Sequence, residues 1–168
     1  LTAFDPSPFH IRPGTEKDVD LILDLIKRLA EYENLSHEVT VSAQQLRDTL
    51  FGPTPAAEVI IGYAGSEAAG FALFFPNYST FLGRPGLYLE DLFVVPKWRN
   101  HGLGRRLLNN LAGVALERGY GRMEWSVLDW NDSAIRFYQK LGARLMDDWK
   151  LCRVTGKNLL ALANIDDP

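Results

Sequence analysis

The stretch Leu92-Phe-Val-Val-Pro-Lys-Trp-Arg99-Asn-His-Gly102-Leu-Gly104-Arg105-Arg-Leu107 decides the fold, because an apolar strand passes through a short glycine-bearing loop into a helix. Glycine lets the backbone approach a ligand closely and adopt positive φ. The first turn of a helix offers N–H groups without intrahelical partners at the positive end of the helix dipole. The pattern therefore predicts an anion site for a phosphate or pyrophosphate, and the alternative is a glycine-bearing turn before an ordinary helix.

The spacing of this loop excludes the common nucleotide motifs. A P-loop requires Gly-x-x-x-x-Gly-Lys-Ser/Thr, which the sequence lacks. A dinucleotide fingerprint requires a third glycine where Leu107 stands. The anion that the loop binds is therefore expected to belong to another class of ligand.

Length and composition predict one globular domain, residues 1–168. The 168 residues are 46% hydrophobic and 23% charged, which is enough for a sizeable core. The net charge of −3 and the pI near 5.6 argue against a nucleic-acid surface and favour a cationic ligand. We therefore expect a cationic ligand and no nucleic-acid partner.

Cysteine and histidine usage indicates neither a disulfide framework nor a metal site. Cys152 is alone, and His10, His37 and His101 are too far apart in the sequence to suggest a metal motif. Cys152 lies in a strand-like pattern, which predicts a buried core position. Because no apolar run approaches roughly 18 residues and residues 1–10 do not resemble a signal peptide, we expect a cytoplasmic protein without a membrane partner.

Hydrophobic periodicity predicts alternating strands and helices. The expected strands cover residues 9–12, 58–63, 68–75, 87–95, 122–128 and 149–154, and the expected helices cover residues 15–30, 42–51, 102–117 and 131–141. A loop over residues 76–86 separates two of the strands. Strand, helix, strand, helix, strand over residues 87–154 predicts an α/β protein, and the strand-rich middle favours a mixed sheet over a doubly wound parallel one.

A second motif follows the loop, in Asn131-Asp-Ser-Ala-Ile-Arg-Phe-Tyr138-Gln-Lys-Leu-Gly142-Ala. Together the two motifs resemble the GCN5-related N-acetyltransferase (GNAT) superfamily, whose patterns are Arg/Gln-x-x-Gly-x-Gly/Ala and Asn-x-x-Ala-x-x-x-Tyr-x-x-x-Gly. With Tyr88-Leu-Glu-Asp91 and residues 78–84, the chain is similar to the diamine/polyamine (spermidine/spermine) and thialysine branch. The resemblance covers residues 9–162 and implies a mixed, mostly antiparallel sheet of six to seven strands flanked by about four helices.

The resemblance also implies acetyl-CoA as the cosubstrate, with no metal. The implied cofactor-binding residues are Leu92, Phe93, Val94, Arg99, Asn100, His101, Gly102, Leu103, Gly104, Arg105, Asn131, Ser133 and Tyr138. Backbone groups of the strand would pair with the pantetheine arm as an added strand, and loop N–H groups would surround the pyrophosphate. Asn100 stands where many relatives have glycine, and asparagine tolerates positive φ. Arg105 and Arg106 either reach the phosphates of CoA or are solvated residues on the helix surface. Asn131 is expected to be a helix N-cap whether or not it also contacts the cofactor.

Acetyl transfer requires a neutral amine, and a lysine-like amine is neutral in only about one molecule in 2500 at pH 7. By the resemblance, Glu90 relays the proton through water, which requires a raised pKa. Asp91 supplies a neighbouring charge, although strict alternation places Glu90 and Asp91 on opposite faces unless a β-bulge intervenes. The alternative for Glu90 is a carboxylate that binds the cationic substrate or faces solvent.

Tyr138, with a hydroxyl pKa of about 10, would donate a proton to the departing thiolate, and its alternative is a core tyrosine. Glu90, Asp91, Tyr78 and Trp130 are the expected substrate-binding residues, whereas Tyr32, Glu33 and Asp129 fit either an amine pocket or structural positions. The expected reaction is direct attack of a small-molecule amine in a ternary complex, and the resemblance implies a homodimer. The alternatives are a peptide N-acetyltransferase and an acyl-CoA-binding module without turnover.

Overall fold

The computed structural model describes residues 9–164, which fall into two compact units that divide between Ser126 and Val127. The first unit contains a five-stranded sheet in the order β1-β2-β3-β4-β5. Its strands are β1 (Phe9–Pro13), β2 (Glu58–Ala64), β3 (Glu67–Ser79), β4 (Arg84–Val94) and β5 (Met123–Trp125). Neighbouring strands are antiparallel except for the parallel pair β4 and β5. The mixed, mostly antiparallel α/β arrangement is therefore confirmed.

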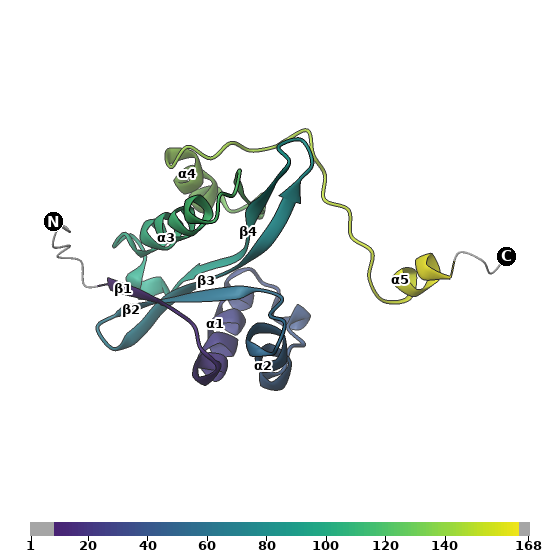
Figure 1. The fold of residues 1–168 in the computed structure, drawn as a ribbon. Helices are drawn as coiled ribbons and strands as arrows, with labels where there is room; N and C mark the ends of the chain where they lie inside the picture. The colour runs from purple at the N-terminus through teal and green to yellow at the C-terminus, as the bar shows by residue number, and fades with distance from the viewer. Residues whose placement is uncertain (1–8, 165–168) are drawn as a thin grey trace. The chain divides into compact units, whose positions relative to one another are not determined.

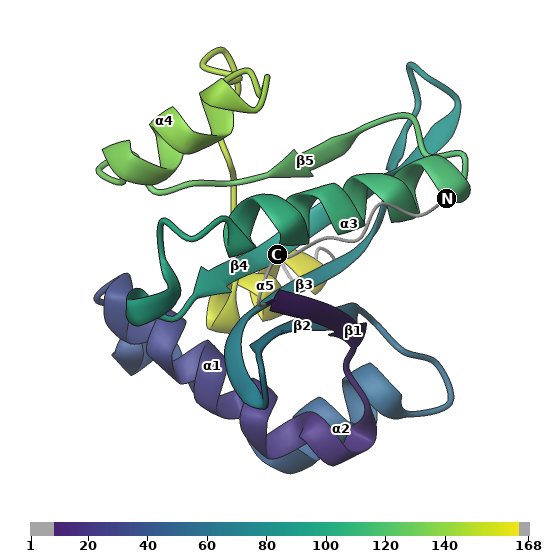
Figure 2. The ribbon, with the colours of Figure 1, turned by 90° about the vertical axis from the view of Figure 1, so that its left-hand side faces the viewer.

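Helices lie on both faces of this sheet (Figures 1 and 2). One face carries α1 (Val19–Tyr32) and α2 (Ala43–Phe51), and the opposite face carries α3 (Leu103–Glu117). Short 3-10 turns are η1 (Glu16–Asp18), η2 (Ser36–Glu38) and η3 (Pro96–Trp98). The buried stripe of α1 follows the helical period, and it packs in one core with strand residues such as Ile61, Phe71 and Phe93.

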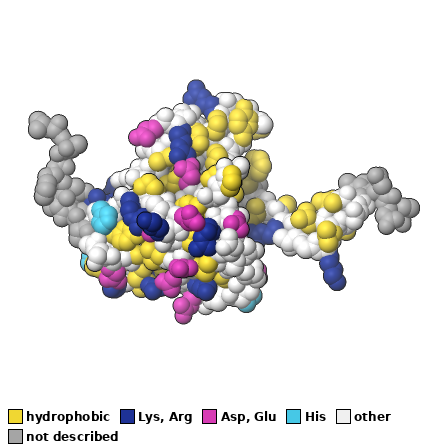
Figure 3. All heavy atoms as spheres, turned by 60° about the horizontal axis from the view of Figure 1, so that its bottom comes forward, with side chains coloured by type: hydrophobic (Ala, Val, Ile, Leu, Met, Phe, Trp, Pro, Cys, Tyr) yellow, Lys and Arg dark blue, Asp and Glu magenta, His cyan; other side chains and the backbone are white. Residues whose placement is uncertain are grey.

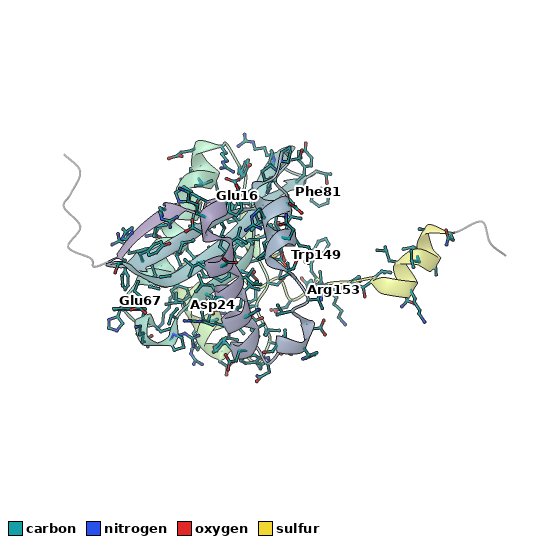
Figure 4. The ribbon with its side chains drawn as sticks, turned by 90° about the horizontal axis from the view of Figure 1, so that it is seen from below. Glu16, Asp24, Glu67, Phe81, Trp149 and Arg153 are labelled. Atoms are coloured by element: carbon teal, nitrogen blue, oxygen red, sulfur yellow. The ribbon has the colours of Figure 1, made fainter. Side chains whose placement is uncertain are left out.

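The outer face of the α1 and α2 layer carries interspersed acidic and basic side chains (Figure 3). Glu16 and Asp24 are among the exposed acidic residues there (Figure 4). Arg47 pairs with Glu16 at 3.3 Å and Arg28 pairs with Asp24 at 2.9 Å. Within residues 9–164, no helix has the length and apolar character needed to cross a membrane.

The second unit contains α4 (Asp132–Lys140) and α5 (Gly156–Ala163). The carboxamide oxygen of Asn131 accepts a hydrogen bond from the backbone N–H of Ala134 at 3.2 Å, which confirms the predicted N-cap. Trp149 and Arg153 lie on the segment that leads to α5 (Figure 4). The sequence patterns did not predict α5.

At the C-terminal end one predicted strand is shortened and another does not form, so the sheet has five strands within the described residues and not six to seven. The strand expected over residues 122–128 is only Met123–Trp125, and residues 149–154 form no strand. Alternating apolar residues make a strand only where a neighbouring strand completes the hydrogen bonds, and no described strand pairs with residues 149–154. Cys152 is accordingly exposed, which contradicts its expected core position.

The expected loop over residues 76–86 is instead the end of a long β-hairpin, because β3 and β4 pair as far as Ser79 and Arg84. The loop was predicted because proline, here Pro76, commonly interrupts a strand. In the structure Pro76 lies opposite Leu87, whose N–H donates to Arg122 on the other side of β4 at 2.9 Å. Pro76 thus occupies a position that needs no N–H toward β4, so the proline does not interrupt the pair.

Candidate functional site

The glycine-bearing loop joins β4 to α3 through two residues with left-handed backbone. Asn100 has φ 64° and Gly102 has φ 90°, so the positive φ expected of the loop is confirmed. Gly102 is the N-cap of α3, and its carbonyl accepts from the backbone N–H of Arg106 at 3.1 Å. The N–H groups of Leu103, Gly104 and Arg105 precede that first helical bond, so they lack intrahelical acceptors and are available to an anion.

Two paired glycines in the sheet set the position of this helix start. Gly62 and Gly70 lie opposite each other on β2 and β3, and the side chain of Leu103 fills the space above them. A Cβ on Gly62 would lie 2.7 Å from Leu103 Cδ1, and a Cβ on Gly70 would lie 2.4 Å from the carbonyl oxygen of Phe93. Leu103 is 1% exposed, so the first turn of α3 is fixed closely against the sheet.

β4 keeps an unpaired edge beside the loop. Its parallel pairing with β5 covers only Leu87 to Leu89, and beyond that point no strand within the described residues pairs with this edge. The N–H of Val95 donates to Ala69 of β3 at 2.9 Å, so by alternation the main-chain groups of Val94 and Leu92 point to the open edge. Those of Phe93 point to β3. An extended ligand would therefore bond to Leu92 and Val94.

Arg99 lies between this edge and α1. Its Nε donates to the carbonyl oxygen of Val94 at 2.9 Å, and its guanidinium carbon lies 4.3 Å from the centre of the Tyr32 ring and 5.7 Å from that of Phe93. Arg105, by contrast, is exposed at the first turn of α3. By the resemblance Arg99 binds the anion, and Arg105 either does so or is a solvated surface residue; in the structure Arg99 contacts Val94, Tyr32 and Phe93.

A β-bulge at Glu90 determines where Asp91 points. Leu89 lies opposite Phe74 and Asp91 lies opposite Leu73, so Glu90 is an extra residue in β4. Leu73 and Phe93 belong to the core beneath α1, and Asp91 shares their face of the sheet. The bulge anticipated from the resemblance is confirmed, and it directs Asp91 toward the α1 layer while Glu90 stays exposed.

Three carboxylates gather where β4 passes the end of α1. Burial, and then the charges of Glu90 and Glu33, together raise the pKa of Asp91 to about 7. Glu33 is the C-cap of α1, where burial raises its pKa as well. The negative end of the α1 dipole adds to the same potential. The cluster suits a cation and contains one carboxyl group that titrates near neutral pH.

The two helix ends give the site a chemical polarity. The negative end of α1 lies at the face reached by Asp91, and the positive end of α3 follows the C-terminal end of β4. One strand thus runs from a region that suits a cation to a region that suits an anion, and main-chain groups of Leu92 and Val94 face the open edge between them. Within residues 9–164, no group of three or more His, Cys, Asp or Glu side chains is placed to hold a metal ion.

The remaining predicted residues lie elsewhere. His101 is exposed and packs its ring 6.4 Å from that of Trp98. Tyr78 is 61% exposed near the tip of the β3–β4 hairpin, where Phe81 projects (Figure 4). Trp130, Ser133 and Tyr138 belong to the second unit with Asn131; Trp130 and Ser133 are exposed, and Tyr138 is half-buried on α4.

Comparison with known proteins identifies the family that combines these features. Residues 23–143 match the model of the acetyltransferase (GNAT) family. The chain belongs to the GNAT acetyltransferase family. As a GNAT enzyme it is an N-acetyltransferase that moves an acetyl group to an amine, and the family uses acetyl-CoA as the donor.

Curated relatives agree with this assignment, and a solved structure shares the fold. The chain is 37% identical to the thialysine N-epsilon-acetyltransferase of Mus musculus, over 92% of this chain and 96% of the relative. It is 33% identical to the L-ornithine N5-acetyltransferase of Arabidopsis thaliana, over 94% and 89% of the two chains. An integron cassette protein from the mobile metagenome of V. cholerae has the same fold, with a TM-score of 0.79 at 24% identity over 94% and 98% of the two chains.

The GNAT enzyme's loop and strand fit an acyl-CoA donor. The N–H groups at the start of α3 suit a pyrophosphate, and the free groups of Leu92 and Val94 suit the amides of a pantetheine arm. The sequence did not predict the contacts of Arg99, and it left open whether Glu33 lines an amine pocket or has a structural position. The contacts of Arg99 with Tyr32, and the influence of Glu33 on Asp91, join positions more than fifty residues apart, so no local spacing pattern reveals them.

Proposed function

We propose that this enzyme transfers the acetyl group of acetyl-CoA to the primary amine of a small cationic substrate. A thialysine-like amino acid, a diamine or a polyamine fits, and the amine attacks directly in a ternary complex. The observation that carries the proposal is the carboxylate cluster of Glu33, Glu90 and Asp91 at the open edge of β4. The two relatives compared act, by their names, on amines of thialysine and ornithine.

The three carboxylates have two roles: two of them bind the cationic amine, and the third accepts its proton. Glu33 and the exposed Glu90 attract the cation to the site. Asp91, with a pKa near 7, accepts a proton from the ammonium as the nitrogen becomes nucleophilic. A carboxylate that binds an ammonium also raises the ammonium's pKa, so binding and deprotonation oppose each other. Placing them on different carboxylates relieves that conflict.

The loop and the strand edge of the first unit suit the acetyl donor, and the family resemblance assigns Asn131, Ser133 and Tyr138 of the second unit to the same donor. Main-chain groups of Leu92 and Val94 align the arm that carries the thioester, and the α3 N–H groups hold its phosphates. Tyr138 donates its phenolic proton to the sulfur as the carbon–sulfur bond breaks. Asn131 and Ser133, at the start of the same helix, contribute to the binding of the donor. We place the enzyme in the cytoplasm, as its single cysteine suggests.

Thiol release across an amine panel tests this function. Purified protein is incubated with acetyl-CoA and each of thialysine, ornithine, putrescine, spermidine and a lysine-containing peptide, while free CoA is followed with a thiol reagent. We expect release well above the hydrolysis background with at least one small amine. Release with the peptide alone would contradict the proposal, and release with none would exclude turnover of these amines.

A further inference from the structure

We propose that Arg99 is a positioning residue that fixes the open edge of β4 for the pantetheine arm, and that it is not a ligand of the CoA phosphates. This inference rests on the proposed function, because it assigns a role within the same acyl-CoA site. Arg99 and the residues it contacts, Val94 and Tyr32, all belong to the first unit.

The first contact defines where the open edge of β4 ends. Leu92 and Val94 direct four main-chain groups to this edge, two N–H and two C=O. The Nε of Arg99 already donates to the Val94 carbonyl at 2.9 Å. An extended arm therefore meets three free groups, which are both groups of Leu92 and the N–H of Val94. The bond from Arg99 occupies the last main-chain acceptor on the open edge of β4, just before the loop begins.

The second contact ties Arg99 to the amine side of the site. Its guanidinium carbon lies 4.3 Å from the centre of the Tyr32 ring, which is within the range of a cation–π contact. Tyr32 is the last residue of α1 and precedes Glu33. The Arg99 side chain thus contacts both the C-terminal end of β4 and the end of α1, where Glu33 follows Tyr32. A planar guanidinium makes both contacts at once, which a lysine ammonium does not reproduce.

These contacts hold Arg99 in a different way from an arginine that binds phosphate. Bidentate binding of phosphate through Nε and one Nη of a guanidinium requires that both donors are free. In Arg99 the Nε is bonded to the backbone and the planar face lies on an aromatic ring. Arg105 is exposed at the positive end of α3, so it is the side chain that a phosphate meets.

Two acetyl donors separate the positioning role from phosphate binding. S-acetylpantetheine has the thioester and both amides of acetyl-CoA but no phosphate. We would measure kcat/KM with each donor for the wild type, Arg99→Gln, Arg99→Lys, Tyr32→Leu and Arg105→Gln. Arg28→Gln is the matched control, because Arg28 is an exposed arginine that pairs with Asp24 on the outer side of α1.

A positioning role predicts equal losses with both donors. We expect Arg99→Gln to lower kcat/KM by about tenfold or more with acetyl-CoA and by the same factor with S-acetylpantetheine, because it frees the Val94 carbonyl in both complexes. Arg99→Lys should not restore activity, and Tyr32→Leu should show a smaller loss of the same kind. Arg105→Gln should lose activity with acetyl-CoA alone. A loss in Arg99→Gln confined to acetyl-CoA, or full rescue by lysine, would overturn the inference.

Calorimetry keeps the test independent of turnover and of folding. The affinities of CoA and of adenosine 3′,5′-bisphosphate, which has phosphates but no pantetheine, are compared in the same variants. Positioning predicts that Arg99→Gln weakens CoA binding and leaves the bisphosphate within about twofold of the wild type, which also shows that the variant is folded. An equal loss for both ligands would contradict it. Tyr32→Leu offers the same comparison if Arg99→Gln does not fold. Lack of turnover in the wild type would instead count against the proposed function.

Discussion

Asp91 lies between a core of apolar side chains and two other carboxylates, so its charge opposes folding. Its folded pKa of about 7 is above the usual value of 3.8. Between about pH 4 and pH 7 the folded protein keeps a proton that the unfolded chain releases, so the free energy of unfolding falls as pH rises through this window. Above about pH 7, Asp91 is charged in the folded protein, and the burial of this charge lowers the free energy of unfolding by its full amount.

Replacing Asp91 with asparagine should therefore stabilise the protein at high pH. We expect Asp91→Asn to raise the free energy of unfolding by roughly 1–3 kcal/mol at pH 8 and to change it little at pH 4. Urea unfolding at the two pH values measures this difference. Glu67→Gln is the control, since Glu67 is an exposed carboxylate paired with Lys97. Equal stabilisation at both pH values would show that Asp91 is not the titrating group.

The same substitution should slow acetyl transfer. The wild-type kcat/KM for the amine should rise with pH through about 7, as Asp91 loses its proton and becomes able to accept one. In Asp91→Asn this step should disappear. A pH–rate profile of both proteins with one amine decides the point, and an unchanged profile would assign the base to another residue, with Glu90 the first alternative.

Tyr138 should act on the rate of turnover and not on the binding of the donor. We expect Tyr138→Phe to lower kcat by about a hundredfold or more, because the leaving sulfur loses its proton donor. The affinity for CoA, measured by calorimetry, should stay close to that of the wild type. Tyr120→Phe, a half-buried tyrosine at the end of α3, is the matched control. Equal kcat in Tyr138→Phe would remove this hydroxyl from the mechanism.

At the residue scale, local chemistry was readable from the sequence and long-range contacts were not. Asn131 caps α4 and Asn100 adopts positive φ, and both follow from the residue type and its neighbours. The pKa of Asp91 depends on Glu33, which lies at the end of a distant helix. The sequence placed Asp91 and Glu90 together but did not show which of them is buried.

At the scale of elements, the packing of α3 on the sheet depends on glycines at β2 and β3. We expect Gly70→Ala to lower the free energy of unfolding by about 1–3 kcal/mol, because its Cβ would lie 2.4 Å from the Phe93 carbonyl oxygen, which is backbone and cannot rotate away. Gly113→Ala is the control, since nothing lies within 4 Å of its Cβ in α3 and helix propensity favours alanine.

Thermal unfolding of both variants measures this effect. Gly113→Ala should raise the unfolding temperature slightly while Gly70→Ala lowers it, and the KM for acetyl-CoA should rise only in Gly70→Ala. A Gly70→Ala protein as stable as the wild type would show that the close approach of β3 and β4 is not required.

Elements with strong periodicity were predicted well. The patterns placed α1, α2, α3 and α4, and the bulge at Glu90 followed from the resemblance. The segment over residues 76–86 was wrong because Pro76 suggests a break, whereas its position opposite Leu87 tolerates proline. The strand predicted over residues 122–128 was shortened and the one over residues 149–154 did not form, because strands depend on partners that the local sequence does not specify.

At the scale of the whole molecule, apolar side chains remain exposed along the second unit. They include Met146, Trp149, Leu151, Leu160 and Leu162. Exposed apolar residues in this number indicate an interaction surface, and the family resemblance predicts a homodimer. We therefore expect a second copy of the chain to cover this segment.

Analytical ultracentrifugation tests the dimer. The wild type should sediment as a dimer at micromolar concentration, and the double substitution Trp149→Glu with Leu151→Glu should shift it toward monomer. Phe81→Glu is the control, because Phe81 is 96% exposed on the β3–β4 hairpin, outside the second unit. A wild type that sediments as a monomer, or a dimer unaffected by the double substitution, would contradict the expectation.

The most direct test of the central claim is a competition in one reaction between thialysine, ornithine, spermidine and a lysine-containing peptide, with acetyl-CoA limiting and the acetylated products quantified by mass spectrometry. The ratios of product report the ratios of kcat/KM. The carboxylate cluster at β4 predicts that acetylated small amine dominates and that Asp91→Asn lowers its yield relative to acetylated peptide. Peptide acetylation exceeding that of every small amine, or no acetylated amine at all, would contradict it.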